Sequence, residues 1–122
     1  MMSKTYICVL LSGVLLFSAT IAYAEATRFF KTAQDIPLMA GLVEDTQNSL
    51  SYDSPQGRII ESISILDGVD EHYVRGYYRQ ALPVFGWQFS SEDQFVRQNE
   101  TLRMDFVVED QQKYFLIFIK PR

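Results

Sequence analysis

The sequence predicts an α+β fold in which one main helix packs on a twisted antiparallel sheet of about five to six strands, in the order β-β-α-β-β-β-β. Several short runs alternate apolar and polar residues, as half-buried strands do. One other stretch repeats its apolar residues every three or four positions, which is typical of an amphipathic helix. Short polar turns between consecutive strands favour antiparallel pairing. A chain of 122 residues has room for one such domain.

Residues 1–24 have the pattern of a secretory signal peptide. Lys4 is their only charge, an apolar stretch follows it, and Ala22-Tyr23-Ala24 closes the segment. The apolar part is shorter than the roughly 20 residues of a membrane span. We interpret Cys8 as a small hydrophobic residue, because no small side chain precedes it as in a lipoprotein. We therefore expect cleavage after Ala24, a periplasmic or secreted bacterial protein and no stable membrane anchor afterwards; an uncleaved anchor is the alternative.

The chain after the leader contains no cysteine, so its stability must come from core packing and not from disulfides. Residues 25–35 mix charged and aromatic side chains without a clear period, and we expect a linker or a loosely docked arm there. Residues 36–122 are expected to form the single α+β domain. In its first segment, residues 36–43, Pro37 favours extended backbone at Ile36 and Gly41 predicts a turn. Five large apolar residues lie in this segment, so it is expected to close one edge of the core.

Residues 48–66 are predicted to form a β-hairpin. Leu50 and Tyr52 alternate with polar residues, and residues 53–57 (DSPQG) have the composition of a turn. The second strand is rich in isoleucine and has one wetter face. Its two faces carry Ile59, Glu61, Ile63 and Ile65 on one side, and Ile60, Ser62, Ser64 and Leu66 on the other.

Residues 70–85 are predicted to be the helix. Asp70 is a favourable N-cap, Glu71 and Arg75 form an i,i+4 pair, and Gly86 stands where a left-handed residue often ends a helix. Pro83 is discordant, because an interior proline costs about 3 kcal/mol. The apolar stripe continues beyond it, so we expect the helix to persist with a kink or a tightened last turn. That stripe consists of Val74, Tyr77, Tyr78, Ala81, Leu82 and Phe85.

The remaining chain is predicted to be a meander of strands at residues 87–89, 95–97, 102–109 and 113–120. The last strand is apolar on both faces, with Tyr114, Leu116 and Phe118 on one and Phe115, Ile117 and Ile119 on the other. A single helix can cover only one face of a sheet. We therefore expect Phe115, Ile117 and Ile119 either to lie beneath the N-terminal arm or to form a dimer or partner surface.

Three sequence motifs resemble those of a known class of small bacterial domains. They are IPLMAG at residues 36–41, YDSPQGR at residues 52–58 and YYRQALPVFGW at residues 77–87. Together they resemble a class of small exported bacterial domains, in which an apolar Pro/Gly segment precedes a strand and a helix ends in a YY…LPxxGW phrase before a β-meander. The resemblance covers most of residues 36–120. It implies a non-enzymatic envelope protein and names no ligand.

The sequence contains no recognisable catalytic or cofactor motif. His72 is the single histidine, and its place in the first helical turn is typical of a surface residue. Phosphate loops, dinucleotide fingerprints and nucleophile elbows do not occur. We accordingly expect no enzyme, no cofactor and no metal site. The formal net charge of −4 argues against a nucleic acid or an anionic membrane as partner.

The arginines offer one weak binding hypothesis. Arg75 and Arg79 lie one turn apart on the polar helix face and are candidate contacts for an anion. Arg97 and Arg103 flank a predicted strand turn and could lie close together on one sheet face. Ordinary ion pairing in an acidic domain is the alternative explanation for all four residues.

Two classes of function remain. The first is an interaction or structural module of the envelope, whose partner is an unknown envelope protein or a second copy of the chain. The second is a small-ligand carrier or sensor with a pocket between helix and sheet. A ligand pocket needs about 300 Å³ or more, so a filled interior would favour the interaction module.

Overall fold

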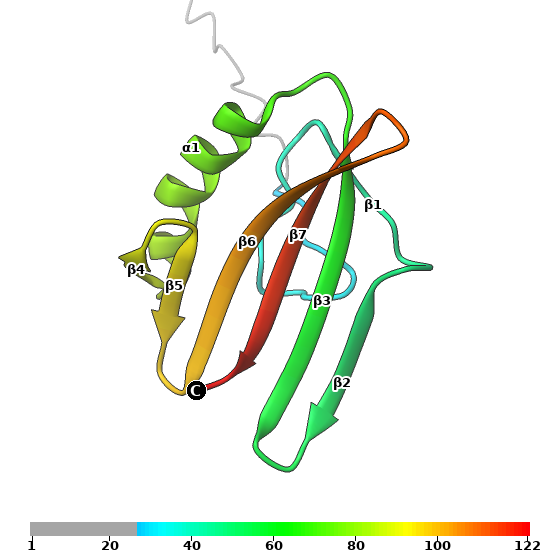
Figure 1. The fold of residues 1–122 in the computed structure, drawn as a ribbon. Helices are drawn as coiled ribbons and strands as arrows, with labels where there is room; N and C mark the ends of the chain where they lie inside the picture. The colour runs from blue at the N-terminus through cyan, green and yellow to red at the C-terminus, as the bar shows by residue number, and fades with distance from the viewer. Residues whose placement is uncertain (1–26) are drawn as a thin grey trace, which may run out of the picture.

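The computed structural model describes residues 27–122, and within this range seven strands form one antiparallel sheet beside a single α-helix (Figure 1). The strand order is β1-β3-β7-β6-β5-β4, and β2 also pairs with β3. In chain order the elements are β1 (Leu42–Glu44), β2 (Leu50–Ser54), β3 (Gly57–Leu66), α1 (Glu71–Ala81), the 3-10 helix η1 (Leu82–Phe85), β4 (Gln88–Ser91), β5 (Gln94–Arg97), β6 (Glu100–Glu109) and β7 (Gln112–Pro121).

The predicted α+β class with one helix and an antiparallel sheet is confirmed, and one additional strand extends it. β1 comes from the apolar segment that was expected only to close the core. It pairs with the second half of β3, from Ser64 to Leu66, whereas β2 pairs with the first half. Gly41 precedes β1 with φ of 98°, and a Cβ there would lie 2.5 Å from a methyl group of Val69. The turn into β1 therefore requires glycine.

The helix ends in the tightened turn that the sequence predicts. The Asp70 carboxylate accepts a hydrogen bond from the Tyr73 N–H at 2.8 Å, which caps the helix start. α1 stops at Ala81, and the chain continues as η1, in whose first turn Pro83 is tolerated. Gly86 then closes the helix with φ of 91°.

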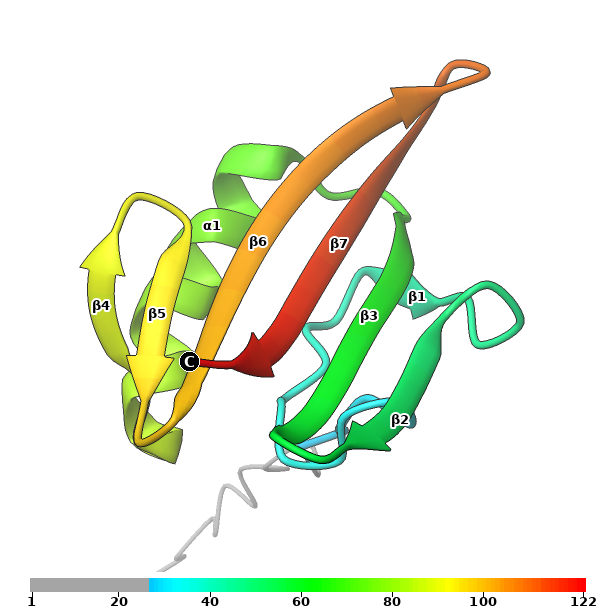
Figure 2. The ribbon, with the colours of Figure 1, turned by 60° about the horizontal axis from the view of Figure 1, so that its bottom comes forward.

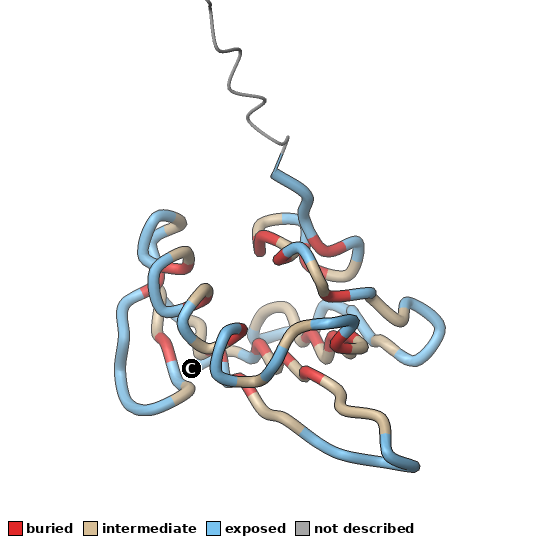
Figure 3. The backbone as a smooth tube through the Cα atoms, turned by 90° about the horizontal axis from the view of Figure 1, so that it is seen from above, coloured by how far each residue is buried: buried red, intermediate tan, exposed pale blue. Residues whose placement is uncertain are grey.

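The helix and the N-terminal arm, residues 27–41, together cover one face of the sheet, which we call the covered face. Tyr78 joins the three parts: its ring stacks on Phe115 of β7 at 5.2 Å between centroids. Its hydroxyl donates to the Pro37 carbonyl at 2.7 Å and accepts from the Met39 N–H at 3.2 Å. In Figure 3 the buried residues gather where the helix and the arm meet the sheet.

The arm is packed along its described length. Phe30 and Ala33 are buried, and the Phe30 N–H donates to the Ile36 carbonyl at 3.0 Å. The carboxylate of Glu44 on β1 accepts hydrogen bonds from the N–H groups of Lys31 and Thr32 at 2.8 and 3.0 Å. These contacts fasten residues 30–36 to the domain.

The predicted signal peptide lies outside the described residues. Within residues 27–122, no helix has the length and apolar character needed to cross a membrane.

Candidate interaction surface

The structure corrects the location of the candidate interaction surface. Phe115, Ile117 and Ile119 are at most 1% exposed and belong to the core between the sheet, α1 and the arm. They therefore form no surface, and the alternative of a covered position applies. Because β7 is apolar on both faces, its hydrophobic pattern does not indicate which face the helix covers.

The face of β3 that contains two serines is also the covered one. Ser62 and Ser64 are at most 1% exposed, and within residues 27–122 their hydroxyl groups have no hydrogen-bond partner. Their register sets them beside Ile117 and Phe115 of β7. The isoleucine-rich face of β3, which carries Ile63 and Ile65, consequently faces away from the helix and is only half-buried.

These registers assemble an apolar surface on the opposite side of the sheet, which we call the open face. Ile63 pairs with Leu116, Ile65 with Tyr114, and Phe118 lies beside Glu61. Nothing in the described chain covers this side, and in Figure 2 α1 and the arm lie behind the strands. The apolar residues of the open face are Val43, Leu50, Tyr52, Ile59, Ile63, Ile65, Val96, Val107, Tyr114, Leu116 and Phe118.

Exposure on the open face is greatest at its sides. Val43, Leu50 and Tyr52 on the short edge strands are about half exposed, at 51, 48 and 49%. The apolar side chains of the central strands β3 and β7 are intermediate, because they cover one another across the sheet, and Val107 of β6 is 39% exposed. A contiguous apolar surface of this kind on a monomer marks a contact site more often than a passive surface.

One row of the open face carries opposite charges on the two sides of an aromatic ring. Phe118 of β7 pairs with Glu61 of β3 on one side and with Arg103 of β6 on the other. The Arg103 guanidinium lies 4.5 Å from the centre of the Phe118 ring and 3.6 Å from the Asp105 carboxylate. Glu61 has no ion-pair partner among residues 27–122.

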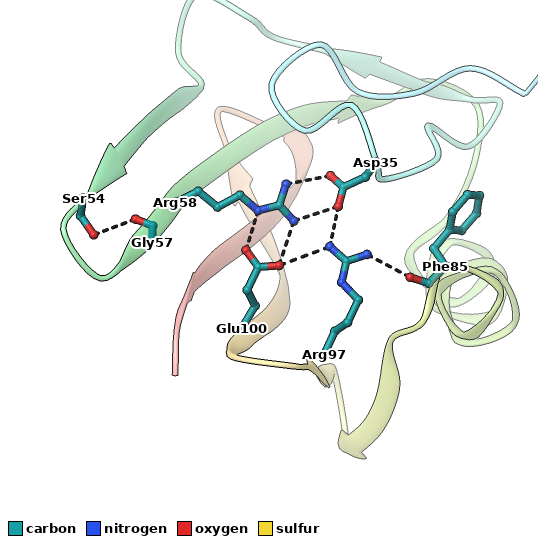
Figure 4. A network of polar contacts seen from close by, with 7 residues as sticks. All are labelled: Asp35, Ser54, Gly57, Arg58, Phe85, Arg97 and Glu100. Carbon is teal, nitrogen blue, oxygen red and sulfur yellow. Dashed lines mark hydrogen bonds and ion pairs between the residues drawn. The ribbon is translucent and has the colours of Figure 1, made fainter.

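A cluster of four charges ties the arm to the far end of the sheet (Figure 4). Asp35 accepts two hydrogen bonds from Arg58, at 2.8 and 2.9 Å, and one from Arg97 at 2.6 Å. Glu100 accepts from the same two arginines, between 2.5 and 3.2 Å. Arg97 also donates to the Phe85 carbonyl at 2.9 Å. All four side chains are matched by opposite charges, so the cluster is a clamp between segments and not an empty anion site.

The clamp changes the proton affinity of its members. Burial alone would raise the pKa of Asp35, but hydrogen bonds from Arg58 and Arg97 outweigh it and hold that pKa well below its usual range. Hydrogen bonding to Asp35, opposed by burial, raises the pKa of Arg58 above its usual value. Both groups therefore stay charged at neutral pH.

The predicted arginine pairs do not converge on a binding site. Arg75 is held by Glu71 at 2.8 Å and by Asp93 at 2.9 Å, and the hydrogen bond to Asp93 is the main reason why its pKa is raised. Arg79 is exposed and lies 5.4 Å from the ring centre of Phe89. The predicted Glu71–Arg75 pair is confirmed, and the charge of Arg75 is thereby neutralised inside the domain.

Arg97 and Arg103 are also apart. Arg97 pairs with Glu100 across β5 and β6 and points into the clamp. Arg103 follows Glu100 by three residues on β6 and is therefore on the opposite, open face. The expected proximity of Arg97 and Arg103 on one sheet face is therefore wrong, because the two faces of the sheet separate them.

The space between helix and sheet is filled by large buried side chains, among them Tyr78, Trp87 and Phe115. A cleft of about 600 Å³ lies elsewhere, between the arm and the helix, and Arg28, Leu38, Met39 and Tyr77 are among its lining residues. A shallower cavity of about 390 Å³ hollows the open face beside Ile63, Tyr114 and Leu116. In the described range, no three His, Cys, Asp or Glu side chains are grouped to hold a metal ion.

No family of proteins, no curated protein and no solved structure matches this chain. The resemblance of its three phrases to small exported bacterial domains therefore stays a prediction.

Sequence reasoning missed the open face and the clamp. The sequence contained one signal for the former: Ile59, Ile63 and Ile65 share a face with only one charged residue, so the serine face was the less apolar of the two. Asp35 offered no signal, because its two arginine partners lie 23 and 62 residues further along the chain.

Proposed function

We propose that this chain is an exported, non-enzymatic protein of the bacterial envelope that acts as an interaction or structural module through the open face of its sheet. The observation that carries the proposal is the uncovered apolar face centred on Leu116 and Phe118. A soluble monomer gains free energy by covering such a face, at about 25 cal/mol per Å² of apolar surface.

Export is supported by the first 24 residues and by the absence of cysteine from the rest of the chain. The basic start, the apolar middle and the Ala22-Tyr23-Ala24 end meet the requirements of a signal peptidase. The resemblance to exported bacterial domains points in the same direction. We expect the protein isolated from the periplasmic fraction to begin at Glu25, and N-terminal sequencing that finds Met1 or Met2 would contradict export with cleavage.

Photo-cross-linking in cells tests the contact function directly. The full gene is expressed with a benzoylphenylalanine at Leu116 on the open face or, as the matched control, at the exposed Tyr73 of α1. We expect protein cross-links from position 116 after irradiation and far fewer from position 73. Equal yields from both positions, or no protein product from position 116, would contradict the proposal.

A small-ligand carrier is the second candidate, and the cleft between arm and helix is the observation that favours it. Its volume of about 600 Å³ exceeds the roughly 300 Å³ that a small molecule needs. Among the described residues that line it, Arg28 is the one charged side chain, so few charges could orient a ligand. Native mass spectrometry of the protein purified from cells separates the two: a carrier retains a bound small molecule, and an interaction module does not.

A further inference from the structure

We infer that the partner of the open face is a second copy of this chain, packed face to face about a two-fold axis that runs along β7. The inference rests on the proposed function, since it takes the open face to be a contact surface. It adds the identity of the partner, the direction of the symmetry axis and two specific ion pairs.

The charges in the Phe118 row select this arrangement. Glu61 and Arg103 stand on opposite sides of Phe118, one strand away in each direction. A two-fold axis along β7, lying between two stacked sheets, preserves the strand direction and exchanges the two sides of β7. Glu61 then faces the partner's Arg103, and Arg103 faces the partner's Glu61, so both charges are matched.

Other symmetric arrangements lose this match. An axis perpendicular to the strands through the Phe118 row would set Glu61 against the partner's Glu61 and Arg103 against the partner's Arg103. An axis along the strands but displaced by one strand would likewise set one of these charges against its own copy, and like charges that face each other weaken association. A perpendicular axis midway between the Phe118 and Leu116 rows would leave Glu61 against the partner's Ile63. Of these arrangements, only the axis along β7 gives Glu61 an opposite charge to face.

The size of the open face suits a stable dimer. Three ten-residue strands, each about 33 Å long and about 4.8 Å from its neighbour, together with the shorter strands give a face of roughly 700 Å². Stable interfaces bury about 800 Å² on each partner. Two stacked sheets lie about 10 Å apart.

Asp105 and Lys120 also lie on the open face. Asp105 pairs with Leu116 near the centre of the face and has an ion pair with Arg103 of its own chain at 3.6 Å. Lys120 is the last residue but one of β7 and is exposed. With the axis along β7, Leu116 and Tyr114 meet their own copies, and Ile63 faces the partner's Asp105.

Charge reversal tests the inference. The full chain is expressed with its leader, purified from the periplasm and studied by sedimentation equilibrium. We expect the wild type to form dimers and Glu61→Arg or Arg103→Glu to weaken dimerisation by about tenfold or more, because each reversal disturbs both symmetric pairs. The double variant Glu61→Arg/Arg103→Glu restores dimerisation to near the wild-type value. Arg79→Glu, on the exposed helix face, is the matched control and leaves it unchanged.

The results also separate this inference from the proposed function. A wild type that stays monomeric at all concentrations overturns self-association, as does a double variant no better than the single ones. If position 116 then cross-links to a different protein in cells, the open face is still a contact surface and only the identity of the partner is wrong. If position 116 gives no protein cross-link at all, the proposed function fails as well. Circular dichroism of each variant confirms that the fold is retained.

Discussion

The two faces of β7 have nearly the same composition and opposite environments. Phe115 and Ile117 are buried under α1 and the arm, whereas Leu116 and Phe118 alternate with them on the half-exposed open face. Neither set is more apolar than the other. They differ because α1 and the arm cover one side of the sheet only, and no other part of residues 27–122 covers the open face.

Contacts of Tyr78 and Asp35 hold α1 and the arm on the covered face of the sheet. Tyr78 reaches from α1 to the arm backbone at Pro37 and Met39 and stacks on Phe115. The clamp around Asp35 then holds the arm at the far end of the sheet.

Two neighbouring substitutions give the sharpest contrast between the faces. Ile117→Asp places an unpaired charge in the core and is expected to cost several kcal/mol, enough to unfold the protein. Leu116→Asp changes the half-buried open face and is expected to cost less, about 1.5 kcal/mol, through lost apolar burial and the like-charged Asp105 opposite it. Thermal unfolding followed by circular dichroism measures both. Comparable losses of stability in the two variants would show that the faces do not differ as described.

Tyr78→Phe tests the contact that holds the arm on the covered face. It removes one hydroxyl and leaves the Pro37 carbonyl and the Met39 N–H without their partner. We expect a loss of about 2 kcal/mol in the free energy of unfolding, measured in urea. Tyr73→Phe, on the exposed helix face, serves as the control and should change stability by less than about 0.5 kcal/mol. Equal effects would argue against the role given to Tyr78.

The dependence of stability on pH tests the contribution of the clamp. The pKa of Asp35 is lower in the folded state than in the unfolded chain, so the ionised carboxylate stabilises the fold above its unfolded pKa of about 3.9. This stabilisation is lost as the pH falls from there toward the folded pKa. We expect Asp35→Asn to be less stable than the wild type at pH 7 and to lose less stability on acidification. Parallel pH profiles for the two proteins would contradict this assignment.

The smallest expected effect is at Gly76, in the exposed part of α1. A Cβ there would have no heavy atom within 4 Å, so glycine serves no close approach at this position. Gly76→Ala is therefore expected to stabilise the protein by up to about 1 kcal/mol through helix propensity alone. A lower melting temperature than that of the wild type would be the contrary result.

Residues within one turn of the chain predicted where the helix begins and ends. Pairing between distant segments determined which residues form β1 and which face of the sheet is buried. Asp70, Pro83 and Gly86 predicted the ends of the helix because caps and breakers act within one turn of the chain. β1 was not predicted, because three residues become a strand only when a partner such as β3 is beside them. The burial of Ser62 likewise depends on distant segments, since its neighbour across the sheet, Ile117 of β7, lies 55 residues further along the chain.

The central claim is that the open face is a contact surface between two copies of the chain. Hydroxyl-radical footprinting of the purified wild type over a range of protein concentrations tests it most directly. The account predicts that labelling of Tyr114 and Phe118 falls as the concentration rises through the dimerisation range, while labelling of Tyr73 on the helix stays constant. Labelling of Tyr114 and Phe118 that does not change with concentration, or that falls equally at Tyr73, would contradict it.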